Sequence, residues 1–216
     1  DNLLANTLPR FGITTTFVDP DVPENFTNAV ASNTRAFFAE SLGNPKLDVL
    51  DLKAIADTAK AAKVPFIVDN TVASPALLNP IAHGANIVIH SLTKYLTGNG
   101  TSLGGIIIDA GTFDWANGNF PEFTEPNPSY HGLNYHEALG AIAFIAKVRI
   151  EGLRDLGSAP SPFNSFQTIQ GIETLDIRMK KHSENALKIA AWLSTKEEVA
   201  WVNYPGLKSS TYNGLA

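Results

Sequence analysis

The stretch HSLTKYLTGNG, residues 90–100, places one lysine among hydroxyl-bearing residues where an apolar run gives way to glycine. Lys94 has no acidic neighbour in this stretch and follows residues 85–89, which are predicted to form a buried strand. A lysine in such a place is either a solvated surface charge or a candidate for a Schiff base with a carbonyl compound. The solvated charge is the commoner case, so a Schiff base is indicated only if other residues suited to a carbonyl compound lie near Lys94.

Pyridoxal phosphate is the common carbonyl partner of such a lysine, and it has specific requirements. Its pyridine nitrogen needs a carboxylate, and its phosphate needs hydroxyl or backbone N–H donors. Asp69 could pair with the ring nitrogen, and Asn44 could contact the ring hydroxyl. Ser91 and Thr93 could bind the phosphate. Each of these residues alone could have a purely structural role, because Asp and Ser are frequent in turns and helix caps.

The elements that would position these residues alternate between strand and helix. β-branched, aromatic or continuous apolar runs predict strands at 12–19, 34–41, 64–70, 85–91 and 104–109. Helices are predicted at 49–63, with Asp48 as N-cap, and at 77–84, ending at Gly84. Alternation of this kind predicts an α/β fold with a mostly parallel sheet and helices on both faces.

The candidate residues all follow predicted strands. Asp69 ends the third strand, Ser91 to Lys94 follow the fourth, and Asn44 lies just past the second. Ligands of open parallel sheets bind beyond the carboxyl ends of the strands. We therefore expect these side chains to share one rim of the sheet.

The second half of the chain has a different pattern. Residues 112–133 are rich in Pro, Asn, Gly and aromatic residues, and are predicted to be a long loop or insertion over a site or an interface. Helices are predicted at 137–157, 161–175 and 176–196, and a strand and turn at 199–207. The predicted domains are residues 1–173, a large domain lacking its N-terminal part, and residues 174–216, the truncated beginning of a C-terminal domain.

Composition excludes several classes of function. The net charge is −5, from 16 basic and 21 acidic residues. The sequence also has no cluster of basic residues of the kind that binds nucleic acid. With no cysteine, disulfides and cysteine-based metal sites are excluded, and a cytoplasmic location fits. No apolar run approaches the ~20 residues of a membrane span. The chain begins without Met, so we expect it to be a piece of a longer polypeptide or the ordered part of one, and a mature processed chain is the alternative.

Two other kinds of site have weak signals. The glycine-rich residues 98–105 precede a predicted strand, whereas a dinucleotide-binding fingerprint follows a strand and opens a helix. The histidines show no metal-ligand spacing, so no metal site is predicted. Arg149, Arg154 and Asp155 are expected to form structural ion pairs, and a subunit contact is one setting for them.

Residues 68–109, VDNTVASPALLNPIAHGANIVIHSLTKYLTGNGTSLGGIIID, resemble the Cys/Met-metabolism family of pyridoxal-phosphate enzymes of fold type I. The family is marked by Asp-Asn-Thr after a strand, then by Ser-x-Thr-Lys-Tyr and a glycine-rich turn. Residues 39–52, AESLGNPKLDVLDL, match as well, and the resemblance extends from about residue 12 to 207.

The resemblance implies a role for each matching residue. Lys94 would hold pyridoxal 5'-phosphate as a Schiff base and later move protons. Asp69 would pair with the pyridine nitrogen, and Asn44 would approach the ring oxygen. Ser91 and Thr93 would bind the phosphate.

Within the family, residues 6–19 and 120–132 are similar to the O-acetylhomoserine sulfhydrylase branch. This implies γ-replacement of acetate by sulfide on O-acetylhomoserine, in methionine and cysteine biosynthesis. The alternatives are another family member, such as a cystathionine γ-synthase or a cystathionine or methionine γ-lyase, and an inactive structural fragment. The resemblance also implies Thr71 near the ring, and a homo-oligomer, a dimer of dimers, with sites shared between subunits.

The chain departs from the family pattern at its ends. The family's ring-stacking Tyr and the Tyr and Arg lent to the phosphate by a neighbouring subunit would precede residue 1. The arginine that binds the substrate carboxylate would follow residue 216. The resemblance therefore implies that this stretch holds only part of a complete site.

Overall fold

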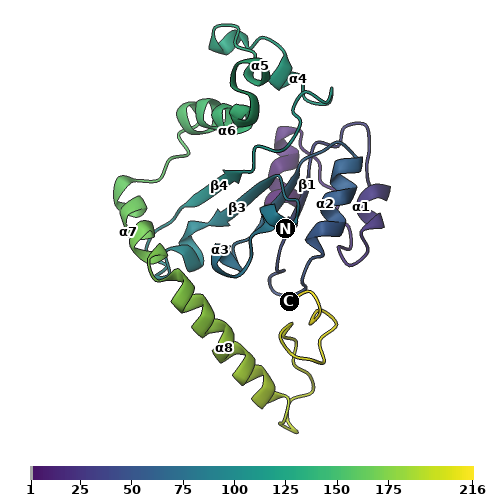
Figure 1. Ribbon diagram of the computed structural model, residues 1–216, viewed down its shortest axis with the longest axis vertical. Helices are drawn as coiled ribbons and strands as arrows, with labels where there is room; N and C mark the ends of the chain where they lie inside the picture. The colour runs from purple at the N-terminus through teal and green to yellow at the C-terminus, as the bar shows by residue number, and fades with distance from the viewer. Residues whose placement is uncertain (1) are drawn as a thin grey trace.

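A four-stranded sheet forms the centre of the computed structural model, which describes residues 2–216 (Figure 1). Its strands, in both sequence and spatial order, are β1 (Phe37–Glu40), β2 (Phe66–Asp69), β3 (Ile87–Ser91) and β4 (Gly105–Asp109). β1, β2 and β3 are parallel, and β4 runs antiparallel to β3. The predicted α/β class with a mostly parallel sheet is confirmed, and β4 makes the sheet mixed.

Helices and short helical turns connect and cover the strands. The α-helices are α1 (Glu24–Asn28), α2 (Leu52–Ala61), α3 (Ser74–Leu77), α4 (Pro121–Thr124), α5 (Tyr135–Leu139), α6 (Ala143–Lys147), α7 (Pro162–Ile172) and α8 (Leu175–Leu193). Tighter 3₁₀ turns occur at Leu8–Phe11, Pro80–His83, Pro128–Tyr130 and Gly140–Ile142. Wider π turns occur at Leu3–Thr7, Leu92–Leu96 and Val148–Asp155.

The start of α2 differs from the prediction. Asp51, not Asp48, is the N-cap, and its side chain accepts a hydrogen bond from the backbone N–H of Ala54 at 3.0 Å. The segment before it stays extended because the N–H of Leu50 donates to the carbonyl of Ser41. The predicted apolar face of the helix is confirmed, and its buried residues are Leu52, Ile55, Ala56 and Ala59.

One face of the sheet packs against α1 and α2. Phe66 and Val68 of β2 and Ile55 of α2 are fully shielded from solvent. Phe26 of α1 packs against Phe37 of β1, with ring centroids 5.2 Å apart. Alternate residues of each strand supply this core, as the two-residue period of a strand requires.

The opposite face is covered by the segment that was predicted to be a long loop. Trp115, Phe120 and Phe123 are buried together with Ile87 of β3. Trp115 stacks on Phe144 of α6, with centroids 5.0 Å apart and rings 5° from parallel. Because large aromatic side chains bury extensive apolar area, residues 112–133 form part of the core. With the first face, this confirms helices on both sides of the sheet.

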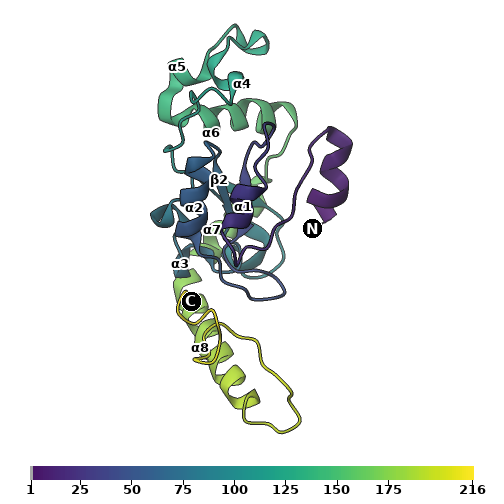
Figure 2. The same ribbon diagram turned by 90° about the vertical axis from the view of Figure 1, so that its right-hand side faces the viewer.

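Two predicted strands are wrong. Residues 13–19 and 199–204 form no ladder with the described sheet. In Figure 2 the N-terminal segment stands off to one side of the sheet, and Phe11 is 75% exposed. β propensity measures how well a residue fits a paired, half-buried surface, and these segments have no neighbouring strand to pair with.

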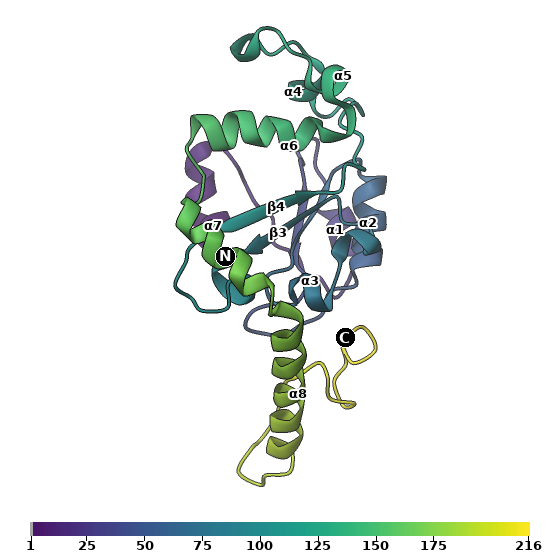
Figure 3. The same cartoon turned by 60° about the vertical axis from the view of Figure 1, so that its left-hand side comes forward.

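The helix predicted at 137–157 is interrupted. Gly140 has φ 53° and ψ −122°, which ends α5 and turns the chain into α6 (Figure 3). The helices predicted at 161–175 and 176–196 are present as α7 and α8. Ser161 caps α7 by accepting from the N–H of Asn164 at 3.1 Å, as its position before Pro162 predicts. The domain boundary at 173/174 stays a prediction.

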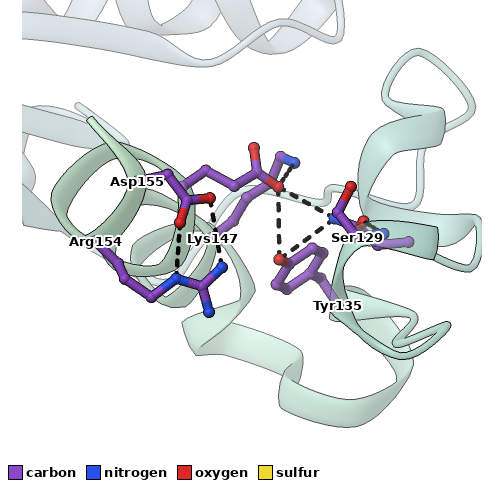
Figure 4. A network of polar contacts seen from close by, with 7 residues as sticks. Ser129, Tyr135, Lys147, Arg154 and Asp155 are labelled. Carbon is purple, nitrogen blue, oxygen red and sulfur yellow. Dashed lines mark hydrogen bonds and ion pairs between the residues drawn. The ribbon is translucent and has the colours of Figure 1, made fainter.

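A polar network attaches the insertion to the helix that follows it (Figure 4). Glu151 accepts hydrogen bonds from Lys147 at 2.5 Å and from Asn127 at 3.2 Å. The Tyr135 hydroxyl is 3.5 Å from the same carboxylate oxygen, and Lys147 lies 5.1 Å from the Tyr135 ring centroid. Burial, with the nearby Glu151 charge, raises the pKa of Tyr135. This phenol therefore stays neutral and donates.

Of the residues predicted to form structural ion pairs, Arg154 and Asp155 do so, with Nε and Oδ1 2.8 Å apart (Figure 4). Arg149 forms no ion pair within residues 2–216. The Arg154 guanidinium also lies 5.4 Å from the ring centroid of Tyr130 in the insertion.

Within residues 2–216, no helix has both the length and the apolar character needed to cross a bilayer.

Candidate active site

The carboxyl ends of β1, β2 and β3 bring several predicted site residues to one edge of the sheet. Glu40 is in register with Asp69, and Asp69 is in register with Ile89. Paired residues point to the same face, and so does Ser91, two residues beyond Ile89. Asp69 and Ser91 therefore share one face at this edge, as the sequence predicts.

Thr71 joins the two strand ends. Its hydroxyl donates to Asp69 Oδ1 at 2.5 Å and accepts from the backbone N–H of Ser91 at 2.8 Å. The backbone N–H of Thr71 donates to the same oxygen of Asp69 at 2.9 Å. One carboxylate oxygen is thereby fixed, while Asp69 Oδ2 has no hydrogen-bond partner within the described residues. A charge held this way is preorganised to receive a cationic partner.

Lys94 lies in a kinked turn directly after β3. Its backbone has φ −89° and ψ −123°, outside the helical region, within the turn Leu92–Leu96. The turn is closed by the bond from Thr97 N to Leu92 O at 3.0 Å and the bond from Gly98 N to Lys94 O at 2.9 Å. The Lys94 side chain is exposed, and within residues 2–216 its amine forms no hydrogen bond or ion pair. The amine is therefore accessible for chemistry.

The hydroxyl groups of the two predicted phosphate ligands, Ser91 and Thr93, differ in their hydrogen bonding. The Ser91 hydroxyl makes no hydrogen bond to the described part of the chain. The Thr93 hydroxyl accepts from the N–H of Gly104 at 3.2 Å and lies 3.4 Å from the Gly104 carbonyl oxygen. Because the second of these is a long contact, Thr93 could exchange it for a stronger acceptor.

Asn44 lies in an exposed loop after β1, preceding a cis peptide bond to Pro45. Its backbone N–H donates to Glu40 Oε2 at 3.0 Å, and the loop is closed by Gly43 N bonding to Asp48 O at 2.9 Å. Sequence reasoning missed the contribution of Glu40, which orients this loop from the face that Asp69 shares. Its place at the end of a strand was the available signal.

His90 lies beside the site but on the opposite face of the sheet. It is buried, and its Nδ1 has no hydrogen-bond partner within the described residues. Burial lowers the pKa of His90, opposed by a smaller effect of the Asp69 charge. His90 therefore packs against the core side of the sheet. A neutral imidazole places no charge behind the Asp69 face.

The donor set at this edge fits pyridoxal phosphate. A carboxylate with one free oxygen suits the protonated ring nitrogen, an accessible amine suits the aldehyde, and the free Ser91 hydroxyl suits the phosphate. The structure brings Asp69, Thr71 and Ser91 into one hydrogen-bonded group. Lys94 and Asn44 follow the same strand ends, but within residues 2–216 they form no hydrogen bond or ion pair with that group or with each other.

The whole chain, residues 1–216, matches the family model described as Cys/Met metabolism PLP-dependent enzyme. The chain belongs to this family. Its cofactor is pyridoxal phosphate, which agrees with the donor set and with the family resemblance of the sequence. Within the residues that the structure describes, no cluster of His, Cys, Asp or Glu could hold a metal ion.

Curated relatives include enzymes of one branch. The chain is 56% identical to the O-acetyl-L-homoserine sulfhydrylase of Leptospira meyeri, over 96% of this chain and 49% of the relative. It is 46% identical to the homocysteine synthase of Schizosaccharomyces pombe, over 100% of this chain and 51% of that protein. The chain therefore spans about half the length of the curated relatives it matches.

Solved structures show the same similarity in three dimensions. A structure from Campylobacter jejuni, described as an O-acetylhomoserine (thiol)-lyase with an N'-pyridoxyl-lysine-5'-monophosphate, gives a TM-score of 0.94 at 40% identity. It matches 99% of this chain and 53% of that one. The O-acetylhomoserine sulfhydrylase of Wolinella succinogenes gives 0.84 at 34% identity, over 99% and 57%. The PLP fold type I class is confirmed.

Proposed function

We propose that the full protein is a transferase that converts O-acetyl-L-homoserine and sulfide into L-homocysteine and acetate. The observation that carries this proposal is the group formed by Asp69, Thr71 and Ser91 at the strand ends, with the accessible Lys94 following directly. The names of the relatives support this branch of the family. A thiol could take the place of sulfide as the acceptor without a change in the role of any of these residues.

Lys94 and Asp69 would contact different parts of the cofactor, the aldehyde and the ring nitrogen. When bound, pyridoxal phosphate supplies an aldehyde that bonds to amines and a cationic ring that withdraws electrons from the substrate. Lys94 would hold the aldehyde until the substrate amine displaces it. Asp69 would keep the proton on the ring nitrogen, and Thr71 would keep Asp69 aligned for this. Ser91 and Thr93 would bind the phosphate, with Asn44 near the ring oxygen.

The freed Lys94 amine would then move protons. It would remove the proton from Cα of the substrate, and a second proton would leave Cβ as acetate departs from Cγ. Sulfide would bond to Cγ, and protons would return to Cβ and Cα. One amine can act first as a base and then as an acid because it carries the proton it has removed.

We also propose a cytoplasmic homo-oligomer, a dimer of dimers, in which neighbouring subunits complete each site. Exposed apolar residues on one side of α7 support a contact with another chain, since patches of this kind mark interaction sites. They are Phe163, Phe166, Ile169 and Ile172. The division into domains 1–173 and 174–216 belongs to the same proposal.

The experiment is an assay of the full-length protein with pyridoxal phosphate. Acetate and homocysteine formation from O-acetylhomoserine and sulfide is compared with ammonia release from cystathionine and from methionine. The proposal predicts that the first reaction has the highest kcat/KM. A higher kcat/KM for ammonia release would assign the protein to the lyases, and turnover of none of these substrates would favour a structural role.

A further inference from the structure

The corner between α7 and α8 contacts the turn that carries Lys94, and one arginine of α8 donates hydrogen bonds to both. Arg178 Nη1 donates to the carbonyl oxygen of Tyr95 at 2.8 Å, and its Nη2 donates to that of Gly171 at 2.7 Å. Its Nε donates to the Thr174 hydroxyl at 3.1 Å. A planar guanidinium thus joins the residue after Lys94 to the end of α7.

Apolar packing holds the same corner. Leu92 and Leu96 of the Lys94 turn are buried against Leu175 and Met179 of α8. Figure 3 shows α7 and α8 meeting beside this end of β3. The turn therefore rests on the two helices through both side chains and backbone.

The approach of α7 to the turn is close. A Cβ at Gly171 would lie 2.6 Å from the carbonyl oxygen of Leu96, nearer than real Cβ atoms come. The buried hydroxyls of Thr97 and Thr168 are 3.0 Å apart. Gly98 has φ 85°, and its missing side chain leaves room for Arg178, whose Cζ would be 2.9 Å from a Cβ there. The guanidinium therefore fills the space beside this glycine.

The Lys94 turn needs such support, because Lys94 has a non-helical backbone within it. A lysine side chain is long and flexible, so its amine is only as well placed as the backbone that carries it. Charge-assisted hydrogen bonds to carbonyl oxygens are about twice as strong as neutral ones. Among the described residues, Arg178 is the charged side chain that donates to the turn, through the carbonyl of Tyr95.

We propose that Arg178 is a positioning residue that fixes the Lys94 turn against the α7–α8 corner and so sets where the Lys94 amine lies. The effect on catalysis rests on the proposed function, whereas the effect on the turn does not. Arg178 itself acts through the carbonyl of Tyr95 and touches neither substrate nor cofactor in this account.

The test uses the full-length protein with Arg178→Ala and Arg178→Lys. Hydrogen exchange by mass spectrometry follows the peptide that contains the amides of Thr97 and Gly98, which close the turn. We expect exchange there to be roughly 10-fold faster in Arg178→Ala, with both the apoprotein and the loaded protein. Exchange in β2 is expected to stay unchanged. The matched control is Lys188→Ala, which removes an exposed cation from the same helix.

Kinetics separate positioning from general stability. We expect kcat of Arg178→Ala to fall roughly 10- to 100-fold with a smaller change in KM, because the amine is misplaced and not removed. Arg178→Lys keeps the charge but not the planar fork, so it should restore exchange and kcat only in part. It also serves as the second variant if Arg178→Ala does not fold.

The outcomes are distinct. Unchanged exchange at Thr97 and Gly98 in both variants would overturn the proposal, as would faster exchange with wild-type kcat. Faster exchange throughout the chain, β2 included, would also overturn it, because Arg178 would then stabilise the fold in general. If the wild-type protein shows no turnover and no cofactor at Lys94, the proposed function fails, while the exchange result still decides the role of Arg178 in the turn.

Discussion

Asp69 is the residue whose surroundings say most about the chemistry of the site. One of its oxygens takes two hydrogen bonds from Thr71, which fixes the carboxylate at the edge of the sheet. The sequence predicts the carboxylate from its place after a strand. The link from Thr71 to the N–H of Ser91 depends on the parallel register of β2 and β3, which no sequence motif states.

Replacing Asp69 with Asn tests the importance of its charge. An amide keeps the size and can still accept from Thr71, but it does not stabilise a protonated ring nitrogen. We expect kcat of the full-length variant to fall on the order of 100-fold, the usual loss when a preorganised charge is removed from a reacting centre. The absorption spectrum of the bound cofactor, taken with the steady-state kinetics, checks that the variant still binds it.

Asp57→Asn is the matched control for this substitution. Asp57 is an exposed carboxylate of α2 that pairs with Lys53, distant in sequence from the rim. Such exposed pairs contribute little to stability, so kcat should stay at the wild-type value. Equal kcat for Asp69→Asn and Asp57→Asn would show that the Asp69 charge has no part in the reaction.

At the level of elements, the contact between α7 and the Lys94 turn depends on a glycine. In Gly171→Ala the new methyl group would meet the carbonyl oxygens of Thr97 and Leu96, so α7 must move away from the turn. Overpacking of this kind costs about 1–3 kcal/mol. We expect the free energy of unfolding of the full-length protein, measured by urea denaturation, to fall by that amount.

Gly152→Ala provides the comparison. A Cβ at Gly152 would have its nearest neighbour, Val148 Cγ1, at 3.9 Å, an ordinary contact. Since alanine favours helical backbone over glycine, this variant should be neutral or more stable by about 0.5–1 kcal/mol. A loss for Gly171→Ala no greater than that for Gly152→Ala would contradict the close packing at the turn.

The sequence predicts the elements whose formation depends on local pairing or capping. Its predictions are wrong where contacts between residues distant in the chain determine the structure. The three parallel strands, α2 and the Ser161 cap of α7 follow from apolar runs and capping residues. Residues 13–19 have strand propensity but no partner, and residues 112–133 have loop composition but supply aromatic side chains to the core. Both outcomes depend on neighbours that are remote in the chain.

The candidate site follows the same rule. Lys94 and Asp69 are predictable because their types and their places after strands are visible in the sequence. Glu40 and Arg178 are not, since each acts on the backbone of a residue that only the fold brings near. Arg178 is 84 positions from Lys94, within a helix whose pattern indicates only amphipathic packing.

At the scale of the whole molecule, the C-terminal segment returns to the N-terminal half. In Figure 1 the chain after α8 turns back and ends near the sheet. The Tyr212 hydroxyl donates to the carboxylate of Asp21, with oxygen distances of 2.8 and 3.0 Å. The side chain of Asn203 donates to the carbonyl of Lys46, in the loop of Asn44. Residues far apart in the sequence therefore support the loop that follows β1.

The Tyr212–Asp21 contact predicts a pH dependence. The hydrogen bond to Asp21, with burial and the negative charges nearby, raises the pKa of Tyr212 from 10.0 to about 12. The folded state keeps the phenol proton where the unfolded state has lost it, so this contribution to stability is complete below pH 10 and is lost between pH 10 and 12. Thermal unfolding of the full-length protein across this range should show wild type losing its advantage over Tyr212→Phe as pH rises.

Tyr204→Phe is the control for that experiment. The Tyr204 hydroxyl has a backbone carbonyl, that of Ser183, at 3.5 Å and no carboxylate partner among the described residues. Its difference in melting temperature from wild type should vary less between pH 10 and 12. A constant difference between wild type and Tyr212→Phe over the same range would contradict the contact with Asp21.

The lysine to which the cofactor is attached can be found by direct chemical labelling. The full-length protein is loaded with pyridoxal phosphate, reduced with borohydride, digested and sequenced by mass spectrometry. We expect a phosphopyridoxyl group on Lys94 of the wild-type protein and none in Lys94→Ala. A peptide containing unmodified Lys94, or the group on another lysine, would contradict it.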